Sequence, residues 1–282
     1  QPTISRYEIK AALSGYEGLI IRSKTYVDAD LLEKAKKLLF VARAGAGIDN
    51  LDVDYLTSRN IAILNAPEGN RNAVAEHTLG LLLGLLHHIN KGNNEVCKGT
   101  WDREGNRGTE LAGRTVAIIG YGFMGMAFAR KLSGMYCRVI AYDKYKRDFS
   151  DDYCDEVSLD QLFEQADILS LHVPLTEETR YMVDQSFLES FRKPIILLNT
   201  ARGEVVSLQA FYNAMQDGRI TGAGLDVLEN EKIAHLTSDE QKIFDKICQE
   251  SRILLTPHVA GWTFESYVRI NEVLSRKIAR LL

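Results

Sequence analysis

The stretch Val116-Ala117-Ile118-Ile119-Gly120-Tyr121-Gly122-Phe123-Met124-Gly125 decides the fold. Its four apolar residues predict a buried strand, and its three glycines follow the spacing G-x-G-x-x-G. A helical pattern over residues 124–132 comes next, and then a strand over residues 139–142 that ends at Asp143, 18 residues beyond the last glycine. A glycine-rich turn between a strand and a helix is typical of a site that binds a dinucleotide through its phosphates.

Each glycine of this turn has an expected role. Gly120 allows the tight turn, Gly122 lets the backbone approach a pyrophosphate, and Gly125 lets the helix pack closely on its strand. The carboxylate of Asp143 is placed to accept hydrogen bonds from an adenosine ribose, and its charge repels a 2′-phosphate. We therefore expect NAD rather than NADP, although three cations soon after Asp143 weaken that preference.

Short apolar strands alternate with helical patterns along the chain, which is typical of parallel βα units. The expected strands lie at 19–21, 40–42, 61–64, 116–119, 139–142, 168–171, 195–198, 222–227 and 253–255. The expected helices lie at 30–39, 52–59, 76–91, 124–132, 159–165, 208–216 and 270–281. We predict an α/β fold with two open parallel-sheet domains, of Rossmann or flavodoxin type, and a cleft between them. The smaller domain comprises both chain ends, residues 1–72 and 262–282, and the larger comprises residues 73–261.

Composition excludes several classes of protein. The chain has 282 residues and a formal net charge of −4, which gives no general attraction for nucleic acids or anionic membranes. The longest apolar run, residues 79–86, is far shorter than the roughly 20 residues of a membrane-spanning helix. The four cysteines have neither CxxC nor zinc-ligand spacing, so we expect free thiols, a cytoplasmic location and no metal site.

Three polar residues each follow a strand of the larger predicted sheet: Arg202, Glu231 and His258. The carboxyl ends of parallel strands line the ligand crevice, so residues that are remote in sequence meet there. A guanidinium suits a substrate carboxylate, an imidazole suits proton transfer near neutral pH, and a carboxylate fixes the tautomer of that imidazole. Two alternatives stay open on the sequence alone, Glu229 in place of Glu231 and His172 in place of His258.

Taken together, these residues resemble the D-2-hydroxyacid dehydrogenases, most closely the D-3-phosphoglycerate dehydrogenase branch, over essentially the whole chain. Besides the glycine turn, the matching stretches are Ile21-Arg22-Ser23-Lys24-Thr25, Arg43-Ala44-Gly45-Ala46-Gly47-Ile48-Asp49-Asn50, Asn65-Ala66-Pro67, Val74-Ala75-Glu76-His77-Thr78, Asn199-Thr200-Ala201-Arg202-Gly203 and Thr256-Pro257-His258.

The resemblance implies a role for each matching position. The catalytic set falls on Arg202, Glu231 and His258, because the family's glutamate comes five residues after the aspartate at Asp226, which selects Glu231 over Glu229. The expected cofactor-binding residues are Gly120, Gly122, Phe123, Met124, Gly125, Asp143, His172, Pro174, Thr200, Ala201, Asp226 and Gly261. The expected substrate-binding residues are Arg22, Ser23, Arg43, Gly45, Ala46, Gly47 and Asn70. Within these sets Asp226 faces the nicotinamide amide, the 45–47 loop binds the substrate carboxylate, and Arg22 and Ser23 hold a substrate phosphate.

The activity that the resemblance implies is hydride transfer between NAD and a D-2-hydroxy acid or 2-keto acid. The expected pair is 3-phosphoglycerate and 3-phosphohydroxypyruvate, with a role in serine biosynthesis. Two alternatives stay open: a glyoxylate or hydroxypyruvate reductase, and a corepressor-like scaffold that binds NAD(H) without turnover. A homodimer is also implied, and the apolar bridge helix with the polar arm over residues 90–107 is its expected contact.

The chain departs from the family pattern at several places. Phe123-Met124 stand where the family usually has Arg-Ile, Lys232 stands where a proline commonly follows the catalytic glutamate, and Trp262 stands where the phosphoglycerate branch usually has a small residue. An indole at this place is expected to reshape the choice of substrate. A first strand and helix are expected to be missing ahead of residues 1–13, and no regulatory extension is expected after the last helix.

Overall fold

The computed structural model describes residues 3–282, which form two compact units. Unit 1 is built from both ends of the chain, up to Arg71 and from Trp262 onward, and unit 2 comprises Asn72–Gly261. Among the described residues no helix is both long and apolar enough to cross a membrane.

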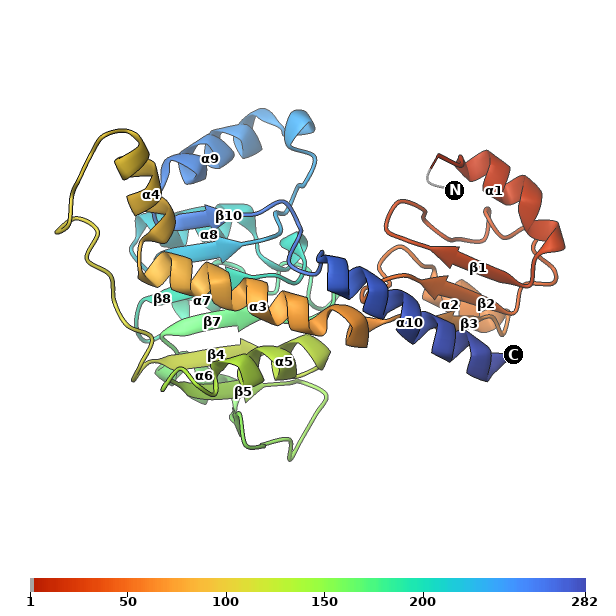
Figure 1. Cartoon of the computed structure of the whole chain (residues 1–282), viewed down its shortest axis with the longest axis horizontal. Helices are drawn as coiled ribbons and strands as arrows, with labels where there is room; N and C mark the ends of the chain where they lie inside the picture. The colour runs from red at the N-terminus through yellow and green to blue at the C-terminus, as the bar shows by residue number, and fades with distance from the viewer. Residues whose placement is uncertain (1–2) are drawn as a thin grey trace. The chain divides into compact units, whose positions relative to one another are not determined.

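Unit 2 contains a sheet of seven parallel strands in the order β10-β9-β8-β7-β4-β5-β6 (Figure 1). The strands are β4 (Thr115–Ile119), β5 (Arg138–Tyr142), β6 (Asp155–Glu156), β7 (Ile168–Leu171), β8 (Ile195–Asn199), β9 (Ile220–Leu225) and β10 (Ile253–Leu255). The chain starts at β4, runs outward to β6, and then returns to β7 on the other side of β4. The strand order therefore reverses between β4 and β7, and ligands of open α/β sheets bind at such a point.

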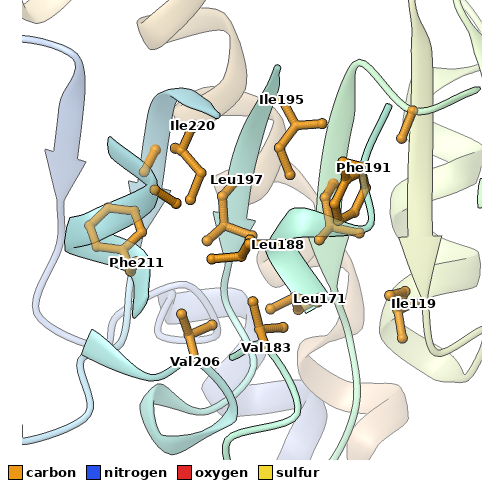
Figure 2. Packing of buried hydrophobic residues seen from close by; sticks show 14 of the residues in the cluster. Ile119, Leu171, Val183, Leu188, Phe191, Ile195, Leu197, Val206, Phe211 and Ile220 are labelled. Atoms are coloured by element: carbon orange, nitrogen blue, oxygen red, sulfur yellow. The ribbon is translucent and has the colours of Figure 1, made fainter. Parts of the chain in front are cut away.

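Helices cover both faces of this sheet. Buried residues of α3 (Pro67–Leu86) and α5 (Phe123–Leu132) pack on one face. Residues of α6 (Leu159–Gln165), α7 (Gln185–Glu189), α8 (Leu208–Gln216) and α9 (Ser238–Gln249) pack on the other. Figure 2 shows Leu197 of β8 in that second cluster with Leu188 of α7 and Phe211 of α8. Each such fully buried side chain contributes about 1.5–3 kcal/mol, so the core holds the strand ends in fixed positions.

Unit 1 contains a parallel sheet of three strands, β1 (Gly18–Ile21), β2 (Phe40–Arg43) and β3 (Ala62–Leu64), in that order. One hydrophobic cluster includes residues of α1 (Arg6–Ala12) and α2 (Val53–Ser58), and another includes residues of α10 (Phe264–Leu281). The ammonium group of Lys277 ties α10 to the loop after β3, where it donates to Asn65 O at 2.9 Å and pairs with Glu68 at 2.8 Å.

The expected helix over residues 30–39 is wrong. The segment forms successive turns, with three-residue hydrogen bonds such as Ala35 N to Leu32 O and Leu38 N to Ala35 O. The guanidinium of Arg59 accounts for this, because it donates to Leu32 O at 3.3 Å and to Ala35 O at 3.0 Å, carbonyls that an α-helix would use for its own bonds. The buried leucines that suggested a helix reach the core from these turns instead.

The bridge helix differs from its expected bounds. It begins at Pro67 rather than at residue 76, and it ends at Leu86, after which a separate helix, α4 (Ile89–Cys97), follows. Two residues lie between these helices, and the second, His88, is in the left-handed conformation with φ 52°. The change of chain direction at His88 separates the two helices.

Candidate active site

The glycine turn of unit 2 lies at the end of β4, where the strand order reverses. Gly120 has φ 92°, which favours glycine, and a Cβ at Gly125 would lie 2.2 Å from Gly120 O. A Cβ at Gly122 would meet nothing within 4 Å. Gly122 also precedes the first residue of α5, so the free space lies beside the amide groups of a helix N-terminus. This arrangement fits a pyrophosphate.

The carboxylate of Asp143 is fixed directly after β5. One oxygen accepts from Tyr121 N at 2.9 Å, and the other accepts from Tyr145 N at 3.0 Å and Lys146 N at 3.2 Å. The carboxylate therefore ties the glycine turn to the loop after β5, which is where a ribose diol is expected.

The three cations near Asp143 are engaged elsewhere. Lys144 pairs with Glu178, and the ammonium group of Lys146 donates to Tyr121 O at 2.6 Å. The Nη1 atom of Arg147 donates to nearby main-chain carbonyls, including Lys146 O at 2.7 Å. Each of the three cations therefore has a partner within the protein.

His172 follows β7 and is placed beside the glycine turn, since a Cβ at Gly120 would lie 2.6 Å from His172 O. Its Nε2 shares a hydrogen bond with Ser170 Oγ at 2.9 Å, and its ring lies 5.5 Å from that of Phe128. Burial lowers the pKa of His172 to about 4, so the imidazole is neutral at neutral pH. A neutral imidazole at this place is suited to line a pocket and poorly suited to donate a proton. Pro174, two residues further on, accepts from the Thr179 hydroxyl through its carbonyl at 2.6 Å.

Asp226 directly follows β9 and is 1% exposed. One carboxylate oxygen accepts from the Thr256 hydroxyl at 2.6 Å and from Val259 N at 2.9 Å, and the other accepts from Ala260 N at 2.8 Å. His77 of α3 reaches the same group, with Nε2 at 2.9 Å from Thr256 Oγ1 and 3.5 Å from the Asp226 carboxylate. A buried carboxylate held by several donors is rigid, as a group that recognises a cofactor amide must be.

His258 and Glu231 lie in contact at the ends of β10 and β9. The imidazole Nδ1 is 2.9 Å from one oxygen of Glu231 and 3.1 Å from the other, and both side chains are 48% exposed. His258 has φ 54°, a strained conformation of the kind found at functional sites, and its amide donates to Asp226 O at 2.7 Å. A carboxylate at Nδ1 holds the proton there and leaves Nε2 for proton exchange with a substrate.

Glu229, the alternative to Glu231, has different partners. Its two oxygens accept from Leu208 N at 2.7 Å, at the start of α8, and from the Tyr181 hydroxyl at 3.1 Å. The geometry thus gives Glu229 a structural contact and places Glu231 against the imidazole.

Arg202 lies in a tightly held turn after β8. Asn199, which is 1% exposed, donates to Arg202 O at 2.9 Å and accepts from Ala201 N at 3.1 Å. A Cβ at Gly203 would lie 1.8 Å from Leu228 O, so this turn touches the segment that leads to Glu231. The guanidinium is half-buried and donates to Ala201 O at 2.6 Å.

Thr200, one residue before Ala201, is held from α3. Its hydroxyl is 3.0 Å from that of the buried Thr78, which in turn donates to Val74 O at 2.7 Å. The strands β8, β9 and β10 are neighbours in a parallel sheet. The segments that follow these strands, which carry Arg202, Glu231 and His258, therefore start at the same edge of the sheet.

The remaining expected residues belong to unit 1. Arg22 and Ser23 follow β1 and are exposed, and the Arg22 guanidinium lies 4.2 Å from the centre of the Trp262 ring. Arg43 ends β2, and its guanidinium lies over Gly45, where a Cβ would meet Nη1 at 1.5 Å. The side chain of Asn65 fixes the next part of this loop, because it donates to the carbonyl of Ala46 at 2.6 Å. Asn70 Oδ1 has no hydrogen-bond partner within residues 3–282.

Three residues of the site had no predicted role: His77, Asn199 and Thr256. Each lies in a stretch that carried the family resemblance, and each acts through another side chain or a turn. For Asn199 and Thr256 the available signal was a polar residue at the end of a strand or directly after it, whereas His77 lies within α3. Within residues 3–282 no group of three or more His, Cys, Asp or Glu side chains is arranged to hold a metal ion.

Comparison with known proteins places this geometry in a family. Residues 79–260 match the model of the D-isomer specific 2-hydroxyacid dehydrogenase NAD binding domain. The hydroxypyruvate reductase of Thermotoga maritima is 34% identical over 99% of this chain and 89% of its own length. The chain belongs to the D-2-hydroxyacid dehydrogenase family.

Two further relatives of this family are similar to the chain. The D-3-phosphoglycerate dehydrogenase of Archaeoglobus fulgidus is 32% identical over 99% of this chain, which spans only 52% of that protein. The structure of D-lactate dehydrogenase from Aquifex aeolicus, complexed with NAD and lactic acid, matches with a TM-score of 0.85 and 29% identity, covering 99% of this chain and 86% of that one. The expected family, the α/β fold with parallel sheets and the expected cofactor, NAD, are confirmed.

Proposed function

We propose that the protein is an NAD-dependent dehydrogenase that interconverts a D-2-hydroxy acid and its 2-keto acid. The observation that carries this proposal is the contact of 2.9 Å between His258 Nδ1 and Glu231, beside the buried carboxylate of Asp226. The relatives are consistent with it, since they include enzymes named for hydroxypyruvate, phosphoglycerate and lactate.

The chain's own residues have distinct tasks in this proposal. When bound, NAD supplies or accepts the hydride at the substrate's second carbon. In the reducing direction His258 gives the proton at Nε2 to the oxygen of that carbon, and Glu231 stabilises the imidazolium before transfer. Arg202 binds the substrate carboxylate and polarises the carbonyl, because a guanidinium presents two parallel donors. In the oxidising direction neutral His258 accepts the proton.

The cofactor in this proposal is bound by residues that fit it. The amide groups at the start of α5 bind the pyrophosphate, Asp143 binds the adenosine ribose, and Asp226 accepts from the nicotinamide amide. Phe123, Met124, His172, Pro174, Thr200, Ala201 and Gly261 border the same cofactor. Most of these residues follow strands of one parallel sheet or begin the helix after β4.

The proposed substrate pair is 3-phosphoglycerate and 3-phosphohydroxypyruvate, a reaction of serine biosynthesis. Arg22 supports this choice, because its guanidinium is exposed and forms no ion pair with any described carboxylate. Ser23, Arg43 and Asn70 would add donors for the phosphate. In the 45–47 loop the amides of Ala46 and Gly47 would bind the substrate carboxylate, because Gly45 N donates to Arg43 O at 2.9 Å. D-3-phosphoglycerate dehydrogenases are among the relatives that are similar to the chain, together with a hydroxypyruvate reductase.

We further propose that the protein is a homodimer, with contacts over α4 and the arm that follows it. Ile89 and Val96 of α4 are exposed, and Trp101 in the arm is 80% exposed. Three large apolar side chains in one segment favour a protein contact over solvent. A cytoplasmic location is proposed because the four cysteines are all free thiols.

The decisive experiment measures NADH oxidation with phosphohydroxypyruvate, hydroxypyruvate, glyoxylate and pyruvate. We expect turnover, with the highest kcat/KM for phosphohydroxypyruvate. Arg202→Ala should raise KM and lower kcat together, and His258→Ala should lower kcat about a hundredfold. Tight NADH binding without turnover of any 2-keto acid would contradict the proposal and would favour a scaffold that binds NAD(H).

A further inference from the structure

Arg22 lies in a corner formed by two aromatic rings of unit 1. The central carbon of its guanidinium is 4.2 Å from the centre of the Trp262 ring and 5.6 Å from that of Tyr267. The two rings are nearly perpendicular, with centres 6.0 Å apart and an angle of 81°. Trp262 therefore contacts the guanidinium, and Tyr267 supports Trp262 edge-on.

The backbone on both sides of this contact is fixed. The carbonyl of Arg22 accepts from the Asn50 side chain at 2.9 Å, directly after β1. On the other side, Thr263 caps α10 by accepting from Ser266 N at 3.0 Å, and Arg269 donates to Gly69 O at 3.3 Å. The first turns of α10 are thereby held against unit 1, and the indole keeps its place beside the end of β1.

The contact with Trp262 leaves hydrogen-bond donors of the guanidinium available. An arginine carries five N–H donors in a rigid, planar fork, and the edge of that fork is suited to bind a phosphate. Among the described residues no carboxylate pairs with Arg22 and no hydrogen bond from its guanidinium is recorded, so that edge is open to a ligand. The ring also restricts a long side chain with many rotamers, which lowers the entropy lost when a ligand binds.

We propose that Trp262, supported by Tyr267, is a specificity-determining residue that positions Arg22 to bind a phosphate monoester on the substrate. The inference rests on the proposed dehydrogenase function and deepens it, because it assigns the choice of a phosphorylated 2-keto acid to an aromatic residue. Trp262 touches Arg22 rather than the reacting atoms, so it is a positioning residue. Its loss should weaken binding of the phosphate while leaving the chemistry at the carbonyl intact.

The test compares kcat/KM for phosphohydroxypyruvate with kcat/KM for hydroxypyruvate, which lacks the phosphate. Trp262→Leu keeps an apolar side chain and removes the aromatic face. We expect it to lower the ratio of the two values about tenfold through KM for the phosphorylated substrate, with kcat and the values for hydroxypyruvate nearly unchanged. Trp262→Phe, which retains a ring, should keep the ratio within about threefold of the wild type.

A double-mutant cycle shows whether the effect passes through Arg22. Arg22→Ala should remove most of the preference for phosphate, and Trp262→Leu should change the ratio no further in that background. Phe264→Ala is the matched control, because Phe264 is 93% exposed, lies two residues from Trp262 and has no recorded ring contact with Arg22. It should leave the ratio unchanged.

Three results would overturn the inference. One is an equal loss for both substrates in Trp262→Leu, and another is an unchanged effect of that substitution in the Arg22→Ala background. The third is a wild-type enzyme with a higher kcat/KM for hydroxypyruvate than for phosphohydroxypyruvate, a result that would still agree with the dehydrogenase proposal. A wild-type protein that binds NADH and reduces none of the four 2-keto acids, glyoxylate and pyruvate included, overturns both proposals, which separates the failure of the function from the failure of the inference.

Discussion

His258 adopts a left-handed backbone conformation at the place where its imidazole meets Glu231. A non-glycine residue persists in such a conformation when its surroundings hold it, and here its amide is held by Asp226 O at 2.7 Å. Asp226 thus fixes the main chain of His258 in addition to its proposed contact with the nicotinamide amide. Asp226 therefore links the part of the site that is proposed to bind the nicotinamide to the part that is proposed to transfer the proton.

The two glutamates after β9 offer a matched pair of substitutions. Glu231→Gln removes the charge that supports the imidazolium of His258, so we expect kcat to fall about 10- to 100-fold with little change in NADH binding. Glu229→Gln keeps an oxygen acceptor for Leu208 N and should leave kcat within about twofold. Steady-state kinetics on both variants measure this, and an equal fall of kcat in the two would argue against the role assigned to Glu231.

His172 predicts a dependence of stability on pH. Its pKa in the folded state is about 4, against an ordinary value of 6.5, so below pH 6.5 the unfolded chain binds more protons than the folded chain. The contribution of His172 to the free energy of unfolding is complete above pH 6.5 and is lost as the pH falls toward 4. Between about pH 7 and about pH 5 we expect the free energy of unfolding to fall by about 2 kcal/mol more in the wild type than in His172→Gln. Urea unfolding at both pH values measures this difference, and parallel losses in the two proteins would contradict the assignment.

Among single residues, the sequence predicts those whose side-chain chemistry is distinctive and that follow the end of a predicted strand. Arg202, Glu231 and His258 are of this kind. Asn199 and His77 were not assigned roles, because they act by holding a turn or a carboxylate, and such contacts depend on which segments meet in three dimensions.

Among the elements, the strands were predicted more closely than the helices. Parallel strands buried on both faces are continuous apolar runs, and their limits are visible as changes of residue type. The segment over residues 30–39 shows where periodicity misleads, since Arg59 from α2's end takes the carbonyls that a helix needs. The helix α9 was not predicted, although Thr237 and Glu240 form a capping box at its start that could have revealed it.

We expect the loop between β5 and β6 to determine the choice between NAD and NADP. Asp143→Asn removes the charge that repels a 2′-phosphate but keeps an acceptor for the amides of Tyr121 and Tyr145. We expect the preference for NADH over NADPH, as the ratio of kcat/KM values, to fall at least about tenfold. Parallel kinetics with both cofactors check this, with Asp148→Asn, an exposed carboxylate in the same loop, as the control. An unchanged preference would show that other groups exclude the phosphate.

For the whole molecule, the chain ends combine into one unit and the middle forms the other. The division after Arg71 and before Trp262 follows from hydrophobic clusters that each draw on one unit. The sequence predicted an amphipathic closing helix from the helical spacing of apolar residues between Ile270 and Leu281. In the structure, residues of this helix pack in one cluster with residues of β2 and β3. The choice of substrate was less accessible, since it depends on contacts such as that between Arg22 and Trp262, which lie 240 positions apart.

The proposed dimer gives a prediction for the intact protein. Ile89→Asp introduces a charge on the exposed face of α4, and burying that charge in an interface is costly. We expect sedimentation at micromolar concentration to find a dimer for the wild type and a shift toward monomer for the variant. Lys37→Asp, a change from one exposed charge to another in unit 1 and outside the proposed contact, is the control. A wild type that sediments as a monomer would contradict the proposal.

The two tryptophans of the chain happen to be divided between the units, Trp101 in unit 2 and Trp262 in unit 1. Each unit consequently has its own intrinsic fluorophore, and replacing either one by phenylalanine leaves the emission of the other to be recorded alone. The unfolding of each unit can therefore be followed separately by fluorescence, with no dye attached.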